Sequence, residues 1–311
     1  MGKRGSSRGD FVLHANGDFQ GRPQVITLEA RPRVSIVIPT LDGDRNGYLP
    51  ALIEQIKAQS VKDIEIILVR GDRRQGRAIN QGALIARGDI LVTMDDDTRL
   101  GHERVIENMV AVLHAHPDIG IVGVSNVVPE DASLLTRLAM DQIPRRRSPL
   151  VSQITDSDMA EHPCMAIPKS LFYRIGGENE LIPRGLDPYL RFMVRKAGYR
   201  VVVIPGTWIH HLPPPGLLPM IRQFFRNGKG AAFCQKFYPQ WVLELTRTHT
   251  TPDRVHRGMP YRMVRNVFNL VISLTQGKIV FFITQLSYLA GFGFGLLTLR
   301  EDRMQREVHE Q

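Results

Sequence analysis

The 311-residue chain has little cysteine and no strong compositional bias. Its 2 cysteines, Cys164 and Cys234, are too few for a disulfide framework or for a zinc site built from several cysteines. Their spacing suggests no redox role, so we expect a reducing compartment. The first residues lack the apolar core of a secretory signal. With 43% hydrophobic and 23% charged residues, the composition excludes a mainly disordered or fibrous chain.

The chain has fewer negatively charged residues than positively charged ones. There are 40 lysines and arginines against 31 aspartates and glutamates, which gives a formal net charge of +9. A basic surface of this kind favours an anionic partner, such as a nucleotide, a phospholipid surface or a nucleic acid.

From Arg33 onward, short β-branched runs alternate with segments of helical periodicity. Continuous apolar runs bounded by turn residues are typical of strands buried on both faces of a parallel sheet. We therefore predict an α/β fold, a Rossmann-like and mostly parallel sheet flanked by helices, with its ligand at the carboxyl ends of the strands. The predicted strands are 34–38, 64–69, 90–94, 119–124 and 201–204.

The composition divides the chain into three predicted regions. Residues 1–32 are a tail or hairpin, 33–235 form the α/β domain, and 236–311 form a membrane-associated helical region. Within the domain, the stretch 126–162 breaks the alternation and is predicted to be a long, irregular loop.

The C-terminal region lacks charge over a long segment. No residue from Ile279 to Leu299 is charged, and this length is enough to cross a hydrocarbon core of about 30 Å. The apolar segment 263–276 before it is interrupted by Arg265 and two asparagines, which suits a membrane surface better than its centre. One full crossing and a helical hairpin folded against the catalytic domain are both compatible with this pattern.

Three carboxylates, Asp95, Asp96 and Asp97, directly follow the predicted strand 90–94. Their mutual repulsion is costly unless a cation joins them, and oxygen ligands favour Mg²⁺ or Mn²⁺. The alternative is an acidic turn before the next helix. Their position at the end of a buried strand favours the metal.

Asp187 allows two interpretations. Asp-Pro is a typical helix start, because the carboxylate caps the helix and proline suits its first turn. Asp187 could equally be a general base that faces the cleft at the strand ends. Residue chemistry alone does not choose between the two.

Two further clusters suggest ligand contacts. His210 and His211 follow the strand 201–204 and are candidates for a metal or phosphate role. Arg226–Gly230 combines glycine with basic residues, a combination that can bind phosphate. By contrast, the glycines at 291, 293 and 295 lie in the apolar C-terminal segment and are expected to pack helices.

Together these features resemble the inverting glycosyltransferases of family 2, which have the nucleotide-sugar-binding GT-A fold. The resemblance covers roughly 33–235 in a consistent order. Leu186 stands where that family usually has a glutamate, directly before Asp187. The matching segments are RVSIVIPTLDGD (33–44), GRAINQGALIARGDILVTMDDD (76–97), IPKSLFYRIGGENE (167–180), GLDPYLRFMVRKAGYRVVVIPG (185–206), IHH (209–211) and RQFFRNGKGAA (222–232).

The resemblance implies roles for the matching residues. Asp187 would be the catalytic base that deprotonates the acceptor hydroxyl. The metal, Mg²⁺ or Mn²⁺, would be held by Asp95, Asp97, His210 and His211. The donor would contact Pro39, Thr40, Asp72, Asn80, Asp95 and Asp96. Contacts to phosphate or acceptor would come from Arg226, Lys229, Arg145 and Arg146.

The implied reaction is transfer of a sugar, with inversion, from a UDP- or GDP-linked donor to a hydroxyl of a glycan or lipid-linked acceptor. The expected setting is the cell membrane, in cell-envelope or polysaccharide biosynthesis, with no nucleic acid as partner. The alternatives are a polyprenyl-phosphate glycosyl synthase, a metal-dependent nucleotidyltransferase and a non-enzymatic, membrane-anchored nucleotide-binding protein.

The basic residues around the apolar segment favour a catalytic domain that faces the cytoplasm. More of them precede the segment, at Arg254, Arg257, Arg262, Arg265 and Lys278, than follow it, at Arg300, Arg303 and Arg306.

Overall fold

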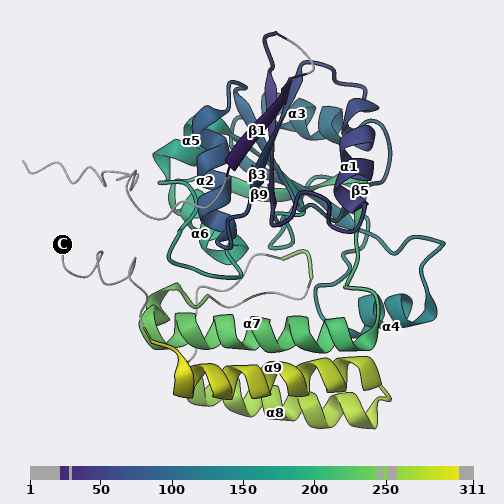
Figure 1. Cartoon of the computed structure of the whole chain (residues 1–311), viewed down its shortest axis with the longest axis vertical. Helices are drawn as coiled ribbons and strands as arrows, with labels where there is room; N and C mark the ends of the chain where they lie inside the picture. Colours follow the sequence, from purple (N-terminus) through teal and green to yellow (C-terminus); the bar gives the residue numbers. More distant parts are fainter. Residues whose placement is uncertain (1–21, 28–29, 244, 246–247, 251–257, 301–311) are drawn as a thin grey trace, which may run out of the picture.

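Figure 1 shows an α/β body above a layer of long helices. The computed structural model describes residues 22–27, 30–243, 245, 248–250 and 258–300. The sheet lies inside the body, helices cover both of its faces, and the C-terminal helices stack below it.

Each predicted strand is present in the sheet. The strands are β1 (Arg22–Thr27), β2 (Val34–Thr40), β3 (Ile64–Arg70), β4 (Ile90–Met94), β5 (Thr98–Leu100), β6 (Ile119–Asn126), β7 (Thr155–Asp156), β8 (Cys164–Pro168) and β9 (Arg200–His211). They form a 9-stranded sheet in the order β1-β3-β2-β4-β8-β6-β9-β5, and β7 pairs with β9 beside this path.

The strands of this sheet are mixed in direction rather than mostly parallel. β2 runs parallel to β3 and β4, and β6 runs parallel to β9. β8 lies between β4 and β6 and is antiparallel to both, and β1, β5 and β7 also pair antiparallel. The sequence did not predict β8, because this short strand leads directly into a helix. The α/β sheet flanked by helices is confirmed.

The helices pack on two separate cores. On one face lie α1 (Tyr48–Lys57) and α3 (Val105–Ala115), and on the other lie α2 (Gln75–Ile85), α5 (Lys169–Arg174) and α6 (Asp187–Lys196). Ile36 and Ile38 of β2 point into the first core, and Val37 points into the second. This alternation along a strand explains why β2 reads as a continuous apolar run.

The stretch 126–162 is not simply a loop, because it contains β7 and helix α4 (Leu134–Gln142). The hydroxyl of Ser133 accepts a hydrogen bond from the Thr136 amide and caps this helix. Only Ala139 and Met140 of α4 are buried. The apolar periodicity of α4 was therefore too weak to predict it.

The predicted N-terminal tail lies only partly within the described residues. β1 pairs antiparallel with β3 and extends the sheet at its edge. Residues 1–21 and 28–29 are outside the described part of the chain.

The layer below the body consists of α7 (Leu217–Phe237), α8 (Met259–Thr275) and α9 (Ile279–Thr298), with a short helix, η1 (Pro239–Trp241), after α7. Arg226–Gly230, suggested by its composition to bind phosphate, lies inside α7 rather than in a loop. Among the described helices, α9 is the one that is long and apolar enough to cross a membrane.

Helices α7 and α9 approach each other closely through glycine. A Cβ atom at Gly228 would overlap the backbone of Tyr288, and one at Gly291 would overlap the backbone of Phe225. The predicted packing role is thus confirmed for Gly291, whereas Gly293 has open space around it.

We expect Gly291→Ala to destabilise the protein by about 1–3 kcal/mol, because the added methyl group forces the two helices apart. Gly293→Ala is the matched control on the same helix, and it should be neutral or stabilise by up to about 1 kcal/mol through helix propensity. Thermal unfolding in mild detergent measures both. Equal effects of the two substitutions would show that α7 and α9 are not in close contact.

Candidate active site

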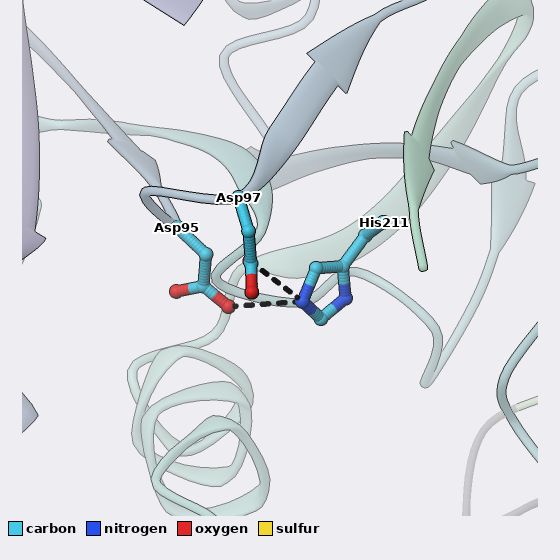
Figure 2. Close-up of side chains that lie close together, drawn as sticks. All are labelled: Asp95, Asp97 and His211. Atoms are coloured by element: carbon cyan, nitrogen blue, oxygen red, sulfur yellow. Dashed lines mark ion pairs between the residues drawn. The ribbon is translucent and has the colours of Figure 1, made fainter. Parts of the chain in front are cut away.

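Two carboxylates and an imidazole meet where β4 and β9 end (Figure 2). His211 Nε2 lies 3.2 Å from Asp97 Oδ1 and 3.6 Å from Asp95 Oδ2. The three ligand atoms lie within 4.8 Å of one another, a spacing that one metal ion can bridge. The carboxylates follow β4, and β5 pairs antiparallel with β9 so that Thr98 lies opposite His211.

Only one of the two candidate histidines belongs to this cluster. Successive strand residues point to opposite faces, and His210 Nδ1 lies 2.7 Å from the carbonyl of Val127 instead. The backbone of His211 is held by Asn126, whose side chain accepts from its amide at 2.8 Å and donates to its carbonyl at 3.0 Å. His210 as a metal ligand is therefore contradicted.

The two carboxylates of the cluster differ in electrostatics. Burial raises the pKa of Asp95 to about 6, against the opposing charge of His211. Burial also acts to raise the pKa of Asp97, but the hydrogen bond and charge of His211, together with Arg45, hold it below its ordinary value. Gln75 donates a hydrogen bond of 2.9 Å to Asp95 and so fixes that carboxylate.

Arg45 and Thr40 join the β2 loop to the acidic turn. Arg45 Nη2 lies 2.7 Å from Asp97 Oδ2, and its Nε lies 3.4 Å from Asp96 Oδ1. The hydroxyl of Thr40 donates to Asp96 Oδ2 at 2.8 Å. Thr40 thus lies at the site, beside the partly buried Pro39, whereas Arg45 was not predicted from the sequence.

Asp187 begins α6 but does not cap it. Its Oδ1 accepts two hydrogen bonds from His162, one from the backbone amide at 2.7 Å and one from Nδ1 at 2.6 Å. The charge of Asp187 also acts on the pKa of Asp95, so the two carboxylates lie within electrostatic range of each other. The geometry therefore disfavours the capping interpretation.

His162 lies between two acids inside the protein. Its Nε2 is 2.7 Å from Glu178 Oε1, and both side chains are almost fully buried. Burial acts to lower the pKa of His162, but Asp187 and Glu178 raise it well above its ordinary value. A charged His162 therefore donates to both carboxylates. Within the described part of the chain, the other oxygen of Glu178 has no hydrogen-bond partner.

Two residues expected to bind the donor have structural partners instead. The buried carboxylate of Asp72 accepts from the guanidinium of Arg77 at 2.6 and 3.0 Å. Asn80 is 2% exposed and bonds the backbone of Glu178 and the carboxylate of Glu180. Asn80 thus fixes the loop that carries the partner of His162.

The basic residues fall into two groups. Arg146 is partly buried and within electrostatic range of Asp97, it donates to Gln223 at 2.7 Å, and loss of hydration lowers its pKa. The exposed Arg226 acts electrostatically on Arg184, which interacts in turn with Asp95. Arg146 and Arg184 therefore lie within electrostatic range of the acidic cluster, and Arg226 lies within range of Arg184.

Arg145 and Lys229 have other contacts. Arg145 donates to the Glu161 carboxylate and to the carbonyl of Asp158. Lys229 Nζ lies 5.6 Å from the centre of the Phe294 ring on α9. The structure therefore does not bring Lys229 to the cluster.

A cavity of about 240 Å³ lies beside His211. It is bounded by β6, β9, the segment 143–148 and α7. Its lining joins polar and apolar side chains, among them Arg145, Arg146, Glu161, Val124, Ile143 and Phe224.

The sequence model of the family described as "Glycosyltransferase like family 2" matches residues 24–230, which is more than half of the chain. The chain belongs to this glycosyltransferase family. The resemblance identified from the motifs is therefore confirmed.

Two curated relatives of this chain are bacterial proteins. An uncharacterized glycosyltransferase of Haemophilus influenzae is 26% identical over 50% of this chain, and an N-acetylglucosaminyltransferase of Azorhizobium caulinodans is 24% identical over 64%. The matched part spans 59% of each relative's length.

The solved mannosyltransferase PcManGT from Pyrobaculum calidifontis, in complex with GDP-Man and Mn²⁺, is similar to this chain in structure. The TM-score is 0.56 at 15% identity, and the match covers 92% of both chains. This likeness confirms the GT-A fold.

If His162 is charged in the folded protein, the free energy of unfolding should depend on pH in a way that can be tested. The stabilisation from a raised histidine pKa is complete below its ordinary value of 6.5 and is lost as the pH rises through the folded value. Glu178→Gln removes one neighbouring charge and lowers the folded pKa, at about 1.4 kcal/mol per unit. Its destabilisation relative to wild type should be largest near pH 6.5 and shrink at alkaline pH, as measured by denaturant unfolding.

Glu180→Gln is the control for this measurement, because the Glu180 carboxylate bonds Asn80. Its effect should stay constant over the same pH range. A pH-independent effect of Glu178→Gln would mean that His162 is not charged in the folded protein.

Proposed function

We propose that this protein transfers a sugar, with inversion, from a nucleoside-diphosphate donor to a hydroxyl of a glycan or lipid-linked acceptor. The main support is the Asp95, Asp97 and His211 cluster at the strand ends, with Asp187 within electrostatic range, in a member of a glycosyltransferase family. Family membership favours sugar transfer over nucleotidyl transfer and over a non-enzymatic scaffold.

The donor set of the cluster fits a divalent metal. Two carboxylates and one imidazole suit Mn²⁺, and Mg²⁺ accepts the carboxylates equally well. Asp95, Asp97 and His211 would hold the ion, which would neutralise the diphosphate of the leaving group. The related fold of a mannosyltransferase solved with GDP-Man and Mn²⁺ supports this proposal.

Asp187 acts as the base in this proposal. Burial acts to raise the pKa of Asp187, but the charge and hydrogen bond of His162 at its Oδ1 hold it below its ordinary value, so the carboxylate is ionised at neutral pH. Oδ2 is then the oxygen that takes the proton as the acceptor hydroxyl attacks the anomeric carbon. His162 fixes the orientation of this base, and Glu178 fixes that of His162.

Donor and acceptor would use opposite sides of the metal cluster. The donor diphosphate would lie near Thr40, Asp96 and the arginines Arg45, Arg184 and Arg226, whose charges would stabilise the departing diphosphate. The acceptor would enter the cavity beside His211, which the partly buried Arg146 lines.

The cavity also supports the second candidate, a polyprenyl-phosphate glycosyl synthase. A partly buried arginine next to apolar side chains suits a phosphate at the end of a lipid better than a neutral glycan. We further propose that the protein works at the cell membrane, in cell-envelope or polysaccharide biosynthesis, with the catalytic domain facing the cytoplasm. The apolar α9 supports the membrane location.

A donor panel tests the proposed function. Purified protein is incubated with UDP- and GDP-sugars and Mn²⁺ or Mg²⁺, and slow hydrolysis of the donor is measured. We expect release of the nucleoside diphosphate from one donor class. Turnover that rises on addition of polyprenyl phosphate, but not of glycans, would identify the second candidate. Release of pyrophosphate from nucleoside triphosphates, without donor hydrolysis, would contradict both.

Asp97→Asn should abolish the enhancement of donor binding by Mn²⁺, because the amide is a much weaker metal ligand than the carboxylate. The affinity is measured by titration calorimetry with and without Mn²⁺. The ligand is the nucleoside diphosphate of the donor that the panel identifies. Asp131→Asn is the control, since Asp131 is an exposed acid paired with Arg99. Unchanged metal dependence in Asp97→Asn would refute the assigned site.

Asp187→Asn should reduce transfer by about 10²-fold or more while donor binding persists, because the amide oxygen still accepts from His162 but cannot take a proton. The measurement is the transfer rate at saturating donor, beside the affinity for nucleoside diphosphate. Near-normal transfer would place the base elsewhere.

A further inference from the structure

Helix α8 exposes its apolar side and turns its polar side toward the protein. Its exposed large side chains are all apolar or aromatic and lie on one side at helical spacing, with Val264 70% and Phe268 61% exposed. The set is Tyr261, Met263, Val264, Val267, Phe268, Val271 and Leu274.

The polar side chains of α8 lie on its less exposed side. Ser273 is 1% exposed, and Arg262, Asn266 and Asn269 are partly buried. Arg262 donates to the carbonyl of Val242. A surface helix in water normally shows the reverse arrangement, with its apolar face toward the protein. The outward face of α8 therefore requires an apolar surrounding.

Both ends of the neighbouring helix α9 are held by the catalytic part of the chain. At its start, the amides of Val280 and Phe281 donate to the side chain of Gln142 on α4, at 2.9 and 3.3 Å. At its end, Lys236 of α7 donates to the carbonyls of Leu296 and Leu299, at 3.2 and 3.0 Å. A helix that crossed a bilayer would have one end on the far side, away from these partners.

Contact with α7 gives a second argument against a crossing. α9 packs along α7 from Ser287, which donates to the carbonyl of Ile221, to the Lys236 contact. α7 also carries Arg222, Arg226 and Lys229. A bilayer crossed by α9 would have to take in these charges as well, at a high cost.

We propose that α8 and α9 lie flat on an anionic bilayer, with the apolar face of α8 inserted among the lipids and neither helix crossing. Anionic lipid is the occupant that the charges favour, because Arg265 lies beside this face with its guanidinium 5.7 Å from the Tyr261 ring, Lys278 follows the turn after α8, and the chain carries a net charge of +9. α7, which lies next to α9, lines the acceptor cavity with Phe224 and Asn227. The membrane surface is therefore brought close to the active site.

Binding to vesicles tests the inserted face. The full-length double variant Val264→Glu and Phe268→Glu should partition into phosphatidylcholine–phosphatidylglycerol vesicles roughly a hundredfold less than wild type, because two apolar anchors are replaced by charges. The control is Leu84→Glu with Ile85→Glu, which places the same charges at exposed apolar positions on α2, in the body. Equal partitioning of the two double variants would overturn the proposal.

Thiol labelling tests whether α8 or α9 crosses. Single cysteines at Gln276, in the turn after α8, and at Thr298, at the end of α9, are both exposed positions. In sealed vesicles with the protein bound outside, an impermeant maleimide should label both, above the background of Cys164 and Cys234. Protection of Thr298→Cys would show that α9 crosses, and protection of Gln276→Cys would show that the whole hairpin does.

Two controls separate other outcomes. If the lipid-free chain is a dimer that Val264→Glu with Phe268→Glu converts to monomers, while vesicle binding persists, the face binds a second copy and the proposal fails. Donor hydrolysis is measured in the same samples. Because neither substituted residue lies at the metal cluster, lost vesicle binding with retained hydrolysis separates membrane docking from the proposed catalytic function.

Discussion

Crowded negative charge at one edge of the sheet is the constraint on which the rest of the site depends. Asp95, Asp96 and Asp97 leave β4 in succession, and Asp187 approaches from α6. Like charges this close are destabilising unless each has a partner. The chain supplies one for every carboxylate, from elements far apart in sequence: Gln75, Thr40, Arg45, His211 and His162. The same arrangement places Asp95 and Asp97 beside the imidazole of His211. A divalent ion bound there could balance the negative charge in place of some of these partners.

His162 compensates buried negative charge inside the protein. A buried cation is costly alone, and so is a buried carboxylate, but His162 lies between Glu178 and Asp187 and bonds both. Asn80 in turn holds the backbone of Glu178. The orientation of the proposed base thus depends on a chain of contacts that runs through α2, the 178–180 loop and the start of α6.

Helix α7 links the catalytic body to the apolar layer. One part of it lines the cavity beside His211 and bonds Arg146 through Gln223, and another packs on α9 so tightly that only glycine fits at 228 and 291. A shift of the α8–α9 pair would therefore act directly on a wall of the proposed acceptor site. In the proposed arrangement, a change at the membrane surface would act through α7 on the shape of the active site.

By itself the sequence determined the buried strands, the acidic turn after β4 and the apolar C-terminal segment, because each is a local pattern of adjacent or periodic residues. Tertiary structure decided the rest. β8 lies antiparallel between β4 and β6, and the register of β9 places His211 rather than His210 beside the carboxylates. The side chains of Asp72 and Asn80 bond other parts of the chain. The contact of Asp187 with His162, and the outward apolar face of α8, likewise have no local signature. They depend on which distant segments close on one another, and hydrophobic periodicity says which side of an element is apolar but not what will cover it.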